Sequence, residues 1–368
     1  MLEESVNALK AVRKHVHTLL EDRTGFEAAS YRSQDGKMKV MLQVDKEAEN
    51  ICARLLVKRF GDDKIRVLGE ETLWQFKEGL DLRTHHVEEY GDRVRLALGP
   101  ETRLTAIVDM IDGSDLVERN LGNWCSAMVF FQPGPSPRIL FCLVHNADDS
   151  IYGADDLGAF AIPSHSFKGA PLVCLSGPQV RKLDRPTKNG NTPTENAAQV
   201  AICYYGQKST HFSTVPAELL EWAKNNPVRD RLRFYNLAGN PMMCRLANGE
   251  NIHAVFEHIG QFPHDAVPGA FIAMKAGATL TDLAGKKISI DELGPYLMTP
   301  SGAKLRYVLA STDELAFELA SPLGSGRMFY VCRNDCAPGQ VALRSSDPPI
   351  CETCHKPMVP HDRRGRAA

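Results

Sequence analysis

The sequence contains no apolar run of the roughly 18 residues that a membrane-spanning helix needs. Neither charge sign is in excess, because 43 Lys and Arg residues oppose 45 Asp and Glu residues and give a formal net charge of −2. The first residues, MLEESVNALKAVRKHV, are amphipathic and acidic at the start, unlike a secretory signal. These absences argue against a membrane protein, a secreted protein and a protein that binds nucleic acid over its whole surface. We therefore expect a cytoplasmic protein with no membrane partner.

The ten cysteines fall into two groups. Six stand singly in mostly apolar surroundings, and we expect them to be buried free thiols: Cys52, Cys125, Cys142, Cys174, Cys203 and Cys244. The other four form two short-spaced pairs towards the C-terminal end: Cys332 with Cys336, and Cys351 with Cys354. In a cytosolic chain such clustering favours a metal over disulfide bonds.

The paired cysteines are typical of a zinc site. Each pair follows a strand-like segment, and two thiolate pairs on turns can meet as a tetrahedral Zn²⁺ site. The segment CETCHKPM resembles the knuckle of a zinc ribbon, although the first pair has three intervening residues where ribbons usually have two. We expect one structural Zn²⁺ on a small zinc-ribbon-like module. A redox-active dithiol and unrelated surface thiols are the alternatives.

Composition and periodicity divide the chain into three parts. One amphipathic helical pattern covers about the first 20 residues, and a second ends at Gly61. A succession of short strands follows. A stretch rich in Pro, Gly, Asn and Ser from about residue 164 to 196 indicates a long connection, after which strands and helices alternate. We expect an α+β metal- and phosphate-binding subdomain, an α/β substrate subdomain and the zinc-ribbon-like module, at residues 1–160, 161–315 and 325–360.

The segment LTAIVDMIDGSDL, residues 104–116, places three carboxylates where a buried strand emerges from the core. Carboxylates gathered at one point repel one another unless a cation neutralises them, and their hard oxygen atoms suit Mg²⁺. Gly113 and Ser114 offer backbone N–H groups at a helix start, which can hold a phosphate. Taken singly, each acidic residue could instead close a turn, cap a helix or lie in a solvated loop.

Together these motifs resemble a known superfamily. The segments GEE at Gly69–Glu71, DMIDGSD at Asp109–Asp115 and HDAVPGAFIAMKAGATLTDLAGK at His264–Lys286 are similar, in order and spacing, to signatures of the inositol monophosphatase and fructose-1,6-bisphosphatase superfamily. The resemblance extends over roughly residues 5–290. It implies an α/β fold, a layered α/β/α/β sandwich of the sugar-phosphatase type with two subdomains.

The resemblance also implies a set of metal ligands. Two or three Mg²⁺ would be bound by four carboxylates and one backbone carbonyl: those of Glu70, Asp109, Asp112 and Asp265, and that of Ile111. Glu71 would bind, and Asp45 would bind or support, the more weakly held ion. The chemistry implied is two-metal hydrolysis of a phosphate ester.

Further roles concern the substrate. The backbone amides of Gly113 and Ser114 would hold the phosphate, and Glu257 would bind a substrate hydroxyl. Ser114 would orient the attacking water and would form the catalytic set with three of the ligands: Glu70, Asp109 and Asp112.

Several positions depart from the superfamily pattern. Met110 replaces a usual Pro, and His264 replaces the Trp that usually precedes Asp265. Pro268 replaces a small residue and is expected in the first turn of a helix, where a missing N–H is tolerated. Glu257 lies eight residues before Asp265 instead of seven. The departures indicate that the ligands are kept while the substrate pocket is rebuilt.

The leading hypothesis is a Mg²⁺-dependent phosphatase that hydrolyses a small phosphomonoester, a sugar or cyclitol phosphate, with metal-activated water. One alternative is a phosphatase for a 3′-phosphorylated nucleotide. Another is a non-catalytic regulatory or nucleic-acid-binding protein that uses the zinc ribbon and its basic tail, HDRRGRAA. Retention of every expected ligand argues against the non-catalytic alternative. A homodimer is expected.

A zinc measurement tests the C-terminal module. If the four paired cysteines bind Zn²⁺, the protein should carry about one zinc per chain that survives dialysis and is lost on acidification, when protons compete for sulfur. Cys351→Ser should unfold the module, which is too short to have a core of its own, and should leave the rest of the protein folded. Metal analysis and circular dichroism measure both effects. Absence of zinc, with all four thiols titratable in the native protein, would exclude the site.

Overall fold

The chain folds into stacked layers of sheets and helices. The computed structural model describes the following residues: 2–22, 28–32, 38–61, 64–69, 72–77, 81–86, 104–113, 116–117, 122–162, 173–174, 200–204, 217–226, 229–237, 239–250, 252–298, 304–324, 327–331, 340–343, 355 and 359–360. No helix within them is both long enough and apolar enough to cross a lipid bilayer.

Nine of the described strands form the first large sheet, in the order β11-β10-β9-β8-β7-β6-β3-β4-β5. Neighbouring strands are antiparallel except for β3 and β6, which are parallel. The strands are β3 (Ile65–Leu68), β4 (Thr72–Lys77), β5 (Asp81–His86), β6 (Leu104–Asp112), β7 (Cys125–Gln132), β8 (Arg138–Asn146), β9 (Ile151–Asp155), β10 (Gly158–Ile162) and β11 (Val173–Cys174).

Five further strands form the second large sheet, in the order β13-β12-β14-β16-β15 among the described residues. β12 is parallel to both of its neighbours, whereas β16 is antiparallel to β14 and β15. The strands are β12 (Val200–Tyr204), β13 (Leu232–Tyr235), β14 (Ala254–Gln261), β15 (Thr279–Thr281) and β16 (Leu305–Ala310).

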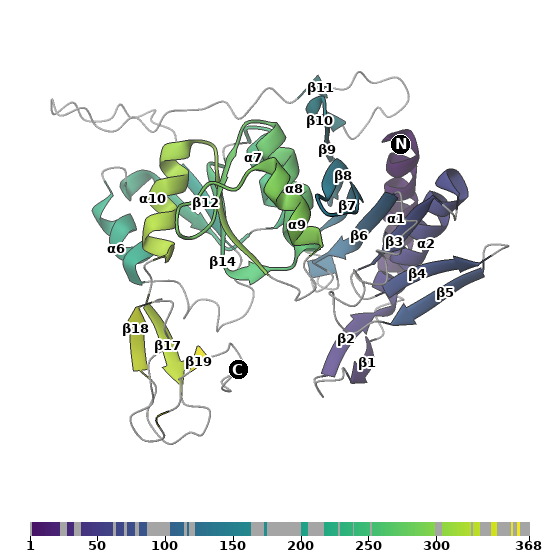
Figure 1. Cartoon of the computed structure of the whole chain (residues 1–368), viewed down its shortest axis with the longest axis horizontal. Coiled ribbons are helices and arrows are strands. Elements are labelled where there is room, and N and C mark those ends of the chain that lie inside the picture. Colours follow the sequence, from purple (N-terminus) through teal and green to yellow (C-terminus); the bar gives the residue numbers. More distant parts are fainter. Residues whose placement is uncertain are drawn as a thin grey trace.

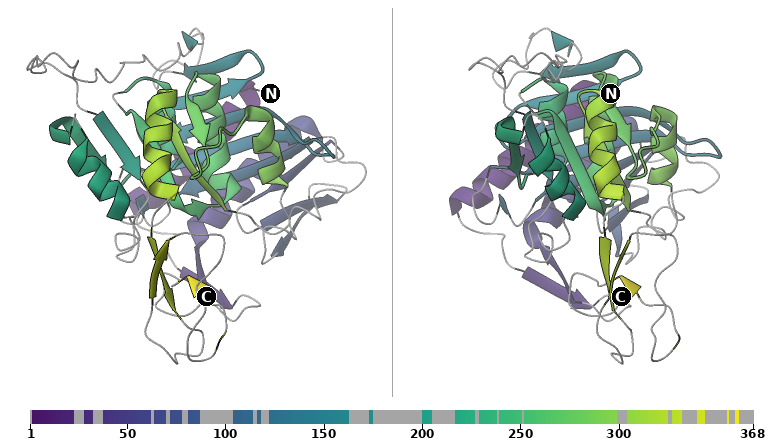
Figure 2. Two further views of the ribbon diagram at one scale, coloured as in Figure 1. Left: turned by 60° about the vertical axis from the view of Figure 1, so that its left-hand side comes forward. Right: turned by 90° about the vertical axis from the view of Figure 1, so that its left-hand side faces the viewer.

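Helices lie between and outside the two sheets (Figure 1 and Figure 2). The helices are α1 (Leu2–Asp22), α2 (Gln43–Phe60), α6 (Ala217–Asn225), α7 (Asn240–Ala247), α8 (Pro263–Lys275), α9 (Ile290–Leu297) and α10 (Asp313–Gly324). α1 and α2 pack on the outer face of the first sheet, while α7, α8 and α9 fill the space between the sheets. This arrangement confirms the α/β/α/β sandwich. α6 and α10 add a fifth layer over the outer face of the second sheet.

Strand β6 shows how the sequence produces these layers. Its residues from Thr105 to Ile111 are all buried, because both faces of the sheet are covered by helices. Side chains alternate between the faces of a strand, so Ala106 and Val108 pack towards α1 and α2, whereas Ile107 packs into the central core. The continuous apolar run thus reflects a strand buried on both sides.

Two small sheets lie outside these layers. β1 (Ala28–Arg32) pairs with β2 (Met38–Leu42), and β17 (Arg327–Val331) pairs with both β18 (Gln340–Leu343) and β19 (Val359–Pro360). The β17–β19 sheet stands apart from the stacked layers (Figure 1). It occupies the region expected for the zinc-ribbon-like module.

The expectations for the cysteines and for the domain boundaries are tested only in part. Five of the six single cysteines are buried free thiols, as expected: Cys52, Cys125, Cys142, Cys203 and Cys244. The Cys174 side chain and all four paired cysteines lie outside the described residues, so the zinc site stays a prediction. The three domain boundaries also stay predictions. The first sheet takes its strands from residues 65–174 and the second from residues 200–310.

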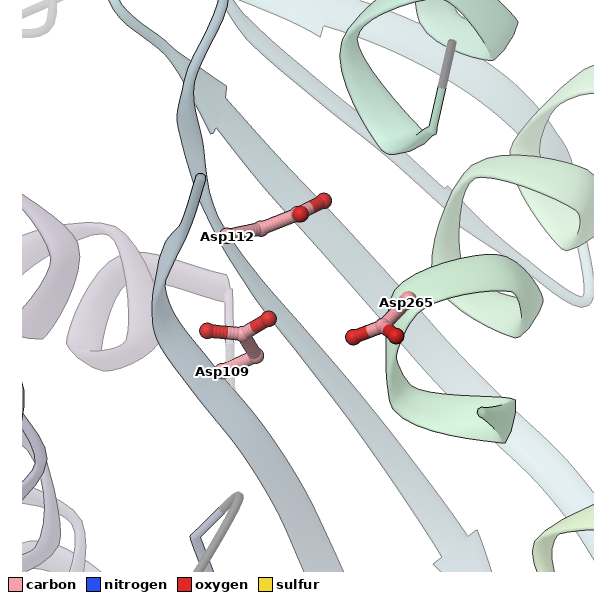
Figure 3. Close-up of side chains that lie close together, drawn as sticks. All are labelled: Asp109, Asp112 and Asp265. Carbon is pink, nitrogen blue, oxygen red and sulfur yellow. The ribbon is translucent and has the colours of Figure 1, made fainter. Parts of the chain in front are cut away.

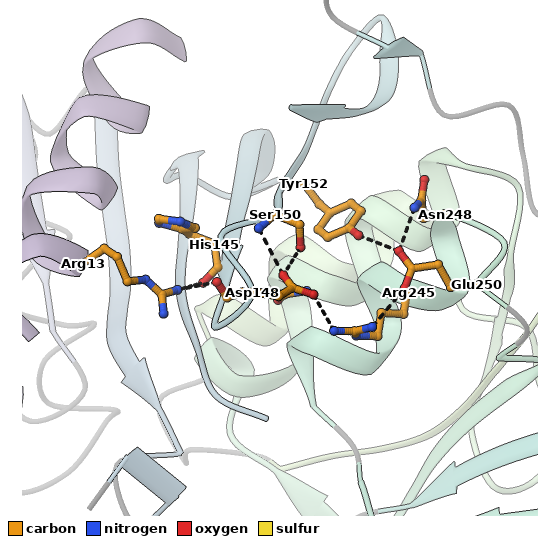
Figure 4. A network of polar contacts seen from close by, with 9 residues as sticks. Arg13, His145, Asp148, Ser150, Tyr152, Arg245, Asn248 and Glu250 are labelled. Carbon is orange, nitrogen blue, oxygen red and sulfur yellow. Dashed lines mark hydrogen bonds and ion pairs between the residues drawn. The ribbon is translucent and has the colours of Figure 1, made fainter. Parts of the chain in front are cut away.

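A polar network fastens the turn between β8 and β9 to helices on both sides of the first sheet (Figure 4). On one side, Arg13 of α1 donates to the carbonyl oxygens of His145 and Asn146, at 2.9 and 2.5 Å. On the other side, Arg245 of α7 contacts the carboxylate of Asp148. The turn therefore connects α1, on the outer face of the first sheet, to α7 in the central helical layer.

Arg13 and His145 share a buried environment at this turn. The Arg13 guanidinium lies 3.9 Å from the centroid of the Trp124 ring, and the residue is 4% exposed. His145 is 2% exposed, and its Nε2 atom lies 3.4 Å from a carboxylate oxygen of Asp149. Burial, and next the positive charge of Arg13, lower the pKa of His145 to about 4. His145 is therefore neutral in the folded protein at neutral pH.

The lowered pKa predicts a loss of stability in acid. The unfolded chain binds a proton at His145 near the ordinary pKa of about 6.5, whereas the folded chain does so near 4. The free energy of unfolding should therefore fall by roughly 3 kcal/mol through this residue as the pH drops across that interval. His145→Gln should remove this part of the pH dependence. Urea titrations at about pH 7.5 and pH 4.5 measure it, with exposed His17→Gln as the control. An unchanged pH dependence in His145→Gln would contradict the assignment.

Candidate metal centre

A β-bulge at the end of β6 turns two carboxylates to the same side of the sheet. Asp109 lies opposite Ala127 of β7, and Asp112 lies opposite Cys125, so three residue steps on β6 match two steps on β7. In a regular strand, residues 109 and 112 would face opposite sides of the sheet. The extra residue of the bulge removes this difference, and both carboxylates lie on the side of β6 that faces Asp265 (Figure 3).

The third carboxylate comes from the first turn of α8. The chain leaves β14, Phe262 takes an extended conformation at the N-cap, and the helix begins at Pro263. The Asp265 N–H then donates to the Phe262 carbonyl oxygen at 3.1 Å. A carboxylate in the first turn is favoured by the partial positive charge of the helix N-terminus.

The three carboxylates converge on one point (Figure 3). One oxygen each of Asp109, Asp112 and Asp265 can be chosen so that all three lie within 4.8 Å of one another. Asp109 is 4% exposed, and the Asp265 side chain is 24% exposed, so the cluster is partly accessible to solvent. Opposite ligands of a Mg²⁺ ion lie about 4.2 Å apart. The oxygen spacing and the all-carboxylate donor set therefore fit a hard divalent cation.

Neighbouring backbone and side-chain groups contact these carboxylates. The Ile111 N–H donates to Asp109 Oδ1 at 3.2 Å. Asp112 Oδ2 accepts from the amide of Asn240 at 3.1 Å and from the Cys125 thiol at 3.6 Å. His264 Nε2 lies 3.2 Å from Asp265 Oδ1. The Asp109 and Asp112 carboxylates are thus each held by at least one hydrogen bond.

Burial keeps the Cys125 thiol protonated beside Asp112. Cys125 is 0% exposed, and burial, followed by the negative charges of Asp112 and Asp109, raises the pKa of its thiol well above the ordinary value. A protonated thiol is a hydrogen-bond donor, as its contact with Asp112 requires. Neither Cys125 nor Asn240 was identified from the sequence as a neighbour of the carboxylate cluster.

Several residues implied by the resemblance are not among the described ones. Glu70, Glu71 and Ser114 lie outside the described residues, and their roles stay predictions. Gly113 follows β6 in a turn with φ 95°, and its carbonyl oxygen accepts from the Leu116 N–H at 2.8 Å. Asp45 lies in the first turn of α2 and is not grouped with the three clustered carboxylates.

Glu49, which the sequence analysis did not single out, lies against the GEE motif. It is 5% exposed and lies one helical turn after Asp45, on the same side of α2. A Cβ atom at Gly69 would overlap the Glu49 carboxylate. The glycine of the GEE motif therefore allows a buried carboxylate to approach the backbone just before Glu70. The spacing of four residues between Asp45 and Glu49 was the available sequence signal.

The eight-residue spacing between Glu257 and Asp265 has a structural counterpart in β14. Glu257 pairs with Tyr307 and Gln261 with Leu305, so four residue steps on β14 match two on β16. Glu257 is 0% exposed, and its Oε1 accepts the N–H groups of Ile259 and Gly260 at 2.6 and 2.8 Å. One oxygen of the expected substrate-binding carboxylate is thus bound to the irregular part of its own strand.

Pro268 does not lie where we expected it. We predicted a place in the first turn of a helix, but α8 begins at Pro263, so Pro268 lies inside the helix, in its second turn. The prediction was wrong because Phe262 and Pro263 start the helix directly after β14, before His264. The helix continues to Lys275 in spite of the proline.

Comparison with known proteins identifies the fold. No family model and no curated protein matches the sequence. Among solved structures, the extragenic suppressor protein SuhB from Bartonella henselae matches with a TM-score of 0.55 and 15% identity, over 89% of this chain and 97% of that one. The chain has the inositol monophosphatase fold.

Two further structures share this fold. A staphylococcal inositol monophosphatase-1, soaked in LiCl, matches with a TM-score of 0.52 and 15% identity, over 84% of this chain and 90% of that one. An IMPase/NADP phosphatase in complex with NADP and Ca²⁺ matches with a TM-score of 0.53 and 15% identity, over 86% of this chain and 93% of that one. At such identities the likeness concerns the fold alone.

Neutralising one clustered carboxylate should stabilise the metal-free protein. In Asp109→Asn the amide oxygen can still accept the Ile111 N–H, while one negative charge of the cluster is removed. We expect a melting temperature equal to the wild type or about 1–3 °C higher in EDTA, and a smaller rise on addition of Mg²⁺. Differential scanning fluorimetry measures both, with exposed Asp156→Asn as the control. An equal Mg²⁺-induced rise in wild type and Asp109→Asn would contradict metal binding at Asp109.

Proposed function

We propose that the protein is a Mg²⁺-dependent phosphatase that hydrolyses a small phosphomonoester, a sugar or cyclitol phosphate. The observation that carries this proposal is the convergence of Asp109, Asp112 and Asp265, from a strand end and a helix start, within 4.8 Å in the inositol monophosphatase fold. Three carboxylates at this spacing are strongly unfavourable without a cation. The charge cluster is therefore best explained as a metal centre.

Two or three Mg²⁺ would be held by Asp109, Asp112 and Asp265, together with Glu70 and the Ile111 carbonyl, and Glu71 and Asp45 would support the weaker ion. When bound, these ions supply an acidified water as nucleophile and neutralise charge on the phosphoryl and leaving oxygens. Asp109 and Asp112 are held by hydrogen bonds from Ile111 and Asn240, and Asp265 is held by its place in the first turn of α8.

The turn after β6 would bind the phosphate. Gly113 begins a turn in which two successive N–H groups, of Leu116 and Val117, bond back to its carbonyl oxygen at 2.8 and 3.1 Å. This is the geometry of a helix start, where backbone N–H groups favour anions. The Gly113 and Ser114 amides would hold the phosphoryl oxygens, and Ser114 would orient the attacking water.

The described aromatic side chains on the outer face of the second sheet give no support to a nucleotide substrate. Tyr204 stacks on Phe256, with ring centroids 5.6 Å apart, and both belong to the core under α6 and α10. Phe234 lies two residues after Leu232, which packs into the same outer core. These rings therefore face away from the central layer that carries Asp265, and they offer no clamp for a base.

The nucleotide alternative remains the second candidate, because a structure with the same fold contains NADP and Ca²⁺.

Glu257 would contact a substrate hydroxyl through the oxygen that does not accept the two backbone N–H groups of β14. A non-catalytic role is a third candidate. The homodimer and the cytoplasmic location are further expectations of this proposal.

Phosphate release from a substrate panel tests the proposal. The panel contains inositol and sugar monophosphates, a sugar bisphosphate, a 3′-phosphorylated nucleotide and NADP, each with Mg²⁺ and with EDTA. We expect Mg²⁺-dependent turnover that Asp112→Asn lowers by about 100-fold or more, because the variant loses a ligand charge. Asp156→Asn should retain turnover. A panel on which no compound is hydrolysed, by protein shown to bind Mg²⁺, would favour the non-catalytic role.

A further inference from the structure

Helix α8 contains an interruption one turn after its start. In a regular helix the N–H of residue 268 would bond to the carbonyl oxygen of His264, but Pro268 has no N–H. Such an interruption normally weakens a helix unless another group replaces the lost bond. The interruption closely follows Asp265, so it bears on how firmly that carboxylate is positioned.

The side chain of Asn240 occupies this interruption. Asn240 is the first residue of α7 and is 0% exposed. Its amide Nδ2 lies 3.4 Å from the His264 carbonyl oxygen, and its Oδ1 accepts the Gly269 N–H at 2.8 Å. The carboxamide thus acts as a backbone peptide group would. Its N–H group faces the carbonyl before Pro268, and its oxygen accepts the N–H that follows Pro268.

The same amide also reaches the other half of the metal centre. Asn240 Nδ2 donates to Asp112 Oδ2 at 3.1 Å. The orientation of the amide follows from chemistry, because an ionised carboxylate only accepts and the Gly269 N–H only donates. One buried side chain therefore contacts both the strand end that carries Asp112 and the helix that carries Asp265.

The backbone before Asn240 permits this close approach. Gly239 has φ 80°, a conformation that favours glycine, and a Cβ atom there would lie 3.5 Å from Asp112 Oδ2. The N-terminus of α7 consequently begins beside the Asp112 carboxylate. Its partial positive charge adds to the attraction between Asn240 and Asp112.

We propose that Asn240 is a positioning residue of the metal centre, which fixes Asp112 relative to Asp265 so that both can bind one cation. The inference rests on the proposed function insofar as the three carboxylates bind a divalent ion. Residues that hydrogen-bond to metal ligands typically contribute about 10- to 100-fold to metal affinity. Loss of the Asn240 amide should weaken metal binding by that factor.

Metal titration of the full chain tests this role without any substrate. Calorimetric titration with Mn²⁺ or Mg²⁺, at a temperature where all variants are folded, gives the dissociation constant. Asn240→Ala should raise it about 10- to 100-fold. Two controls should stay within roughly twofold of wild type: Asn248→Ala, which changes the same residue type at the other end of α7, and Met243→Ala, which changes the same α7–α8 contact at Gly269.

The outcomes separate the inference from the proposed function. Wild-type protein that binds no divalent metal would overturn both. Wild-type affinity in Asn240→Ala would overturn the inference alone, and equal weakening in Met243→Ala would reduce Asn240 to a packing residue. If Asn240→Ala does not fold, Asn240→Ser takes its place. Its shorter hydroxyl cannot span both contacts, so the same weakening is expected and wild-type affinity again overturns the inference.

Discussion

Mutual repulsion among three carboxylates within 4.8 Å is the constraint on which the rest of the structure depends. Flexible elements would let Asp109, Asp112 and Asp265 move apart. The fold instead places two of them beside a bulge in a central strand and the third in the first turn of a buried helix. Both elements are fixed by packing over most of their length, so the repulsion is relieved by a proton or a cation and not by movement of the backbone.

The central helical layer supplies the force that opposes this repulsion. Its apolar side chains form one core with both sheets, so Ile107 of β6, Phe271 of α8 and Leu309 of β16 are buried together. Burial of apolar surface is worth about 25 cal/mol for each Å². A core of this extent readily exceeds the repulsion of a few charges. Packing of the apolar core therefore keeps the end of β6 and the start of α8 close together in spite of the repulsion between their carboxylates.

The resemblance of short motifs to a known superfamily predicted the layers and the convergence of carboxylates, whereas apolar periodicity predicted individual helices and strands. The sequence did not predict the bulges that place Asp109 with Asp112, or that bind Glu257 to its own strand, since a bulge depends on the register of two strands. Asn240 was missed for a similar reason: its partners Asp112 and Gly269 are distant in sequence. The position of Pro268 was wrong because the helix start depends on where β14 ends.

Asn240 compensates for the hydrogen bond that Pro268 removes from α8. The proline alone would leave a break in α8 close to the Asp265 carboxylate. A buried amide alone would need partners that a regular helix does not offer. Together, the break supplies a carbonyl and an N–H, and the amide fills the gap while it holds Asp112. The departure from the family pattern at Pro268 is thus compensated from α7. The hydrogen bond that α8 loses at Pro268 is replaced by a hydrogen-bonded connection between the two elements that carry Asp112 and Asp265.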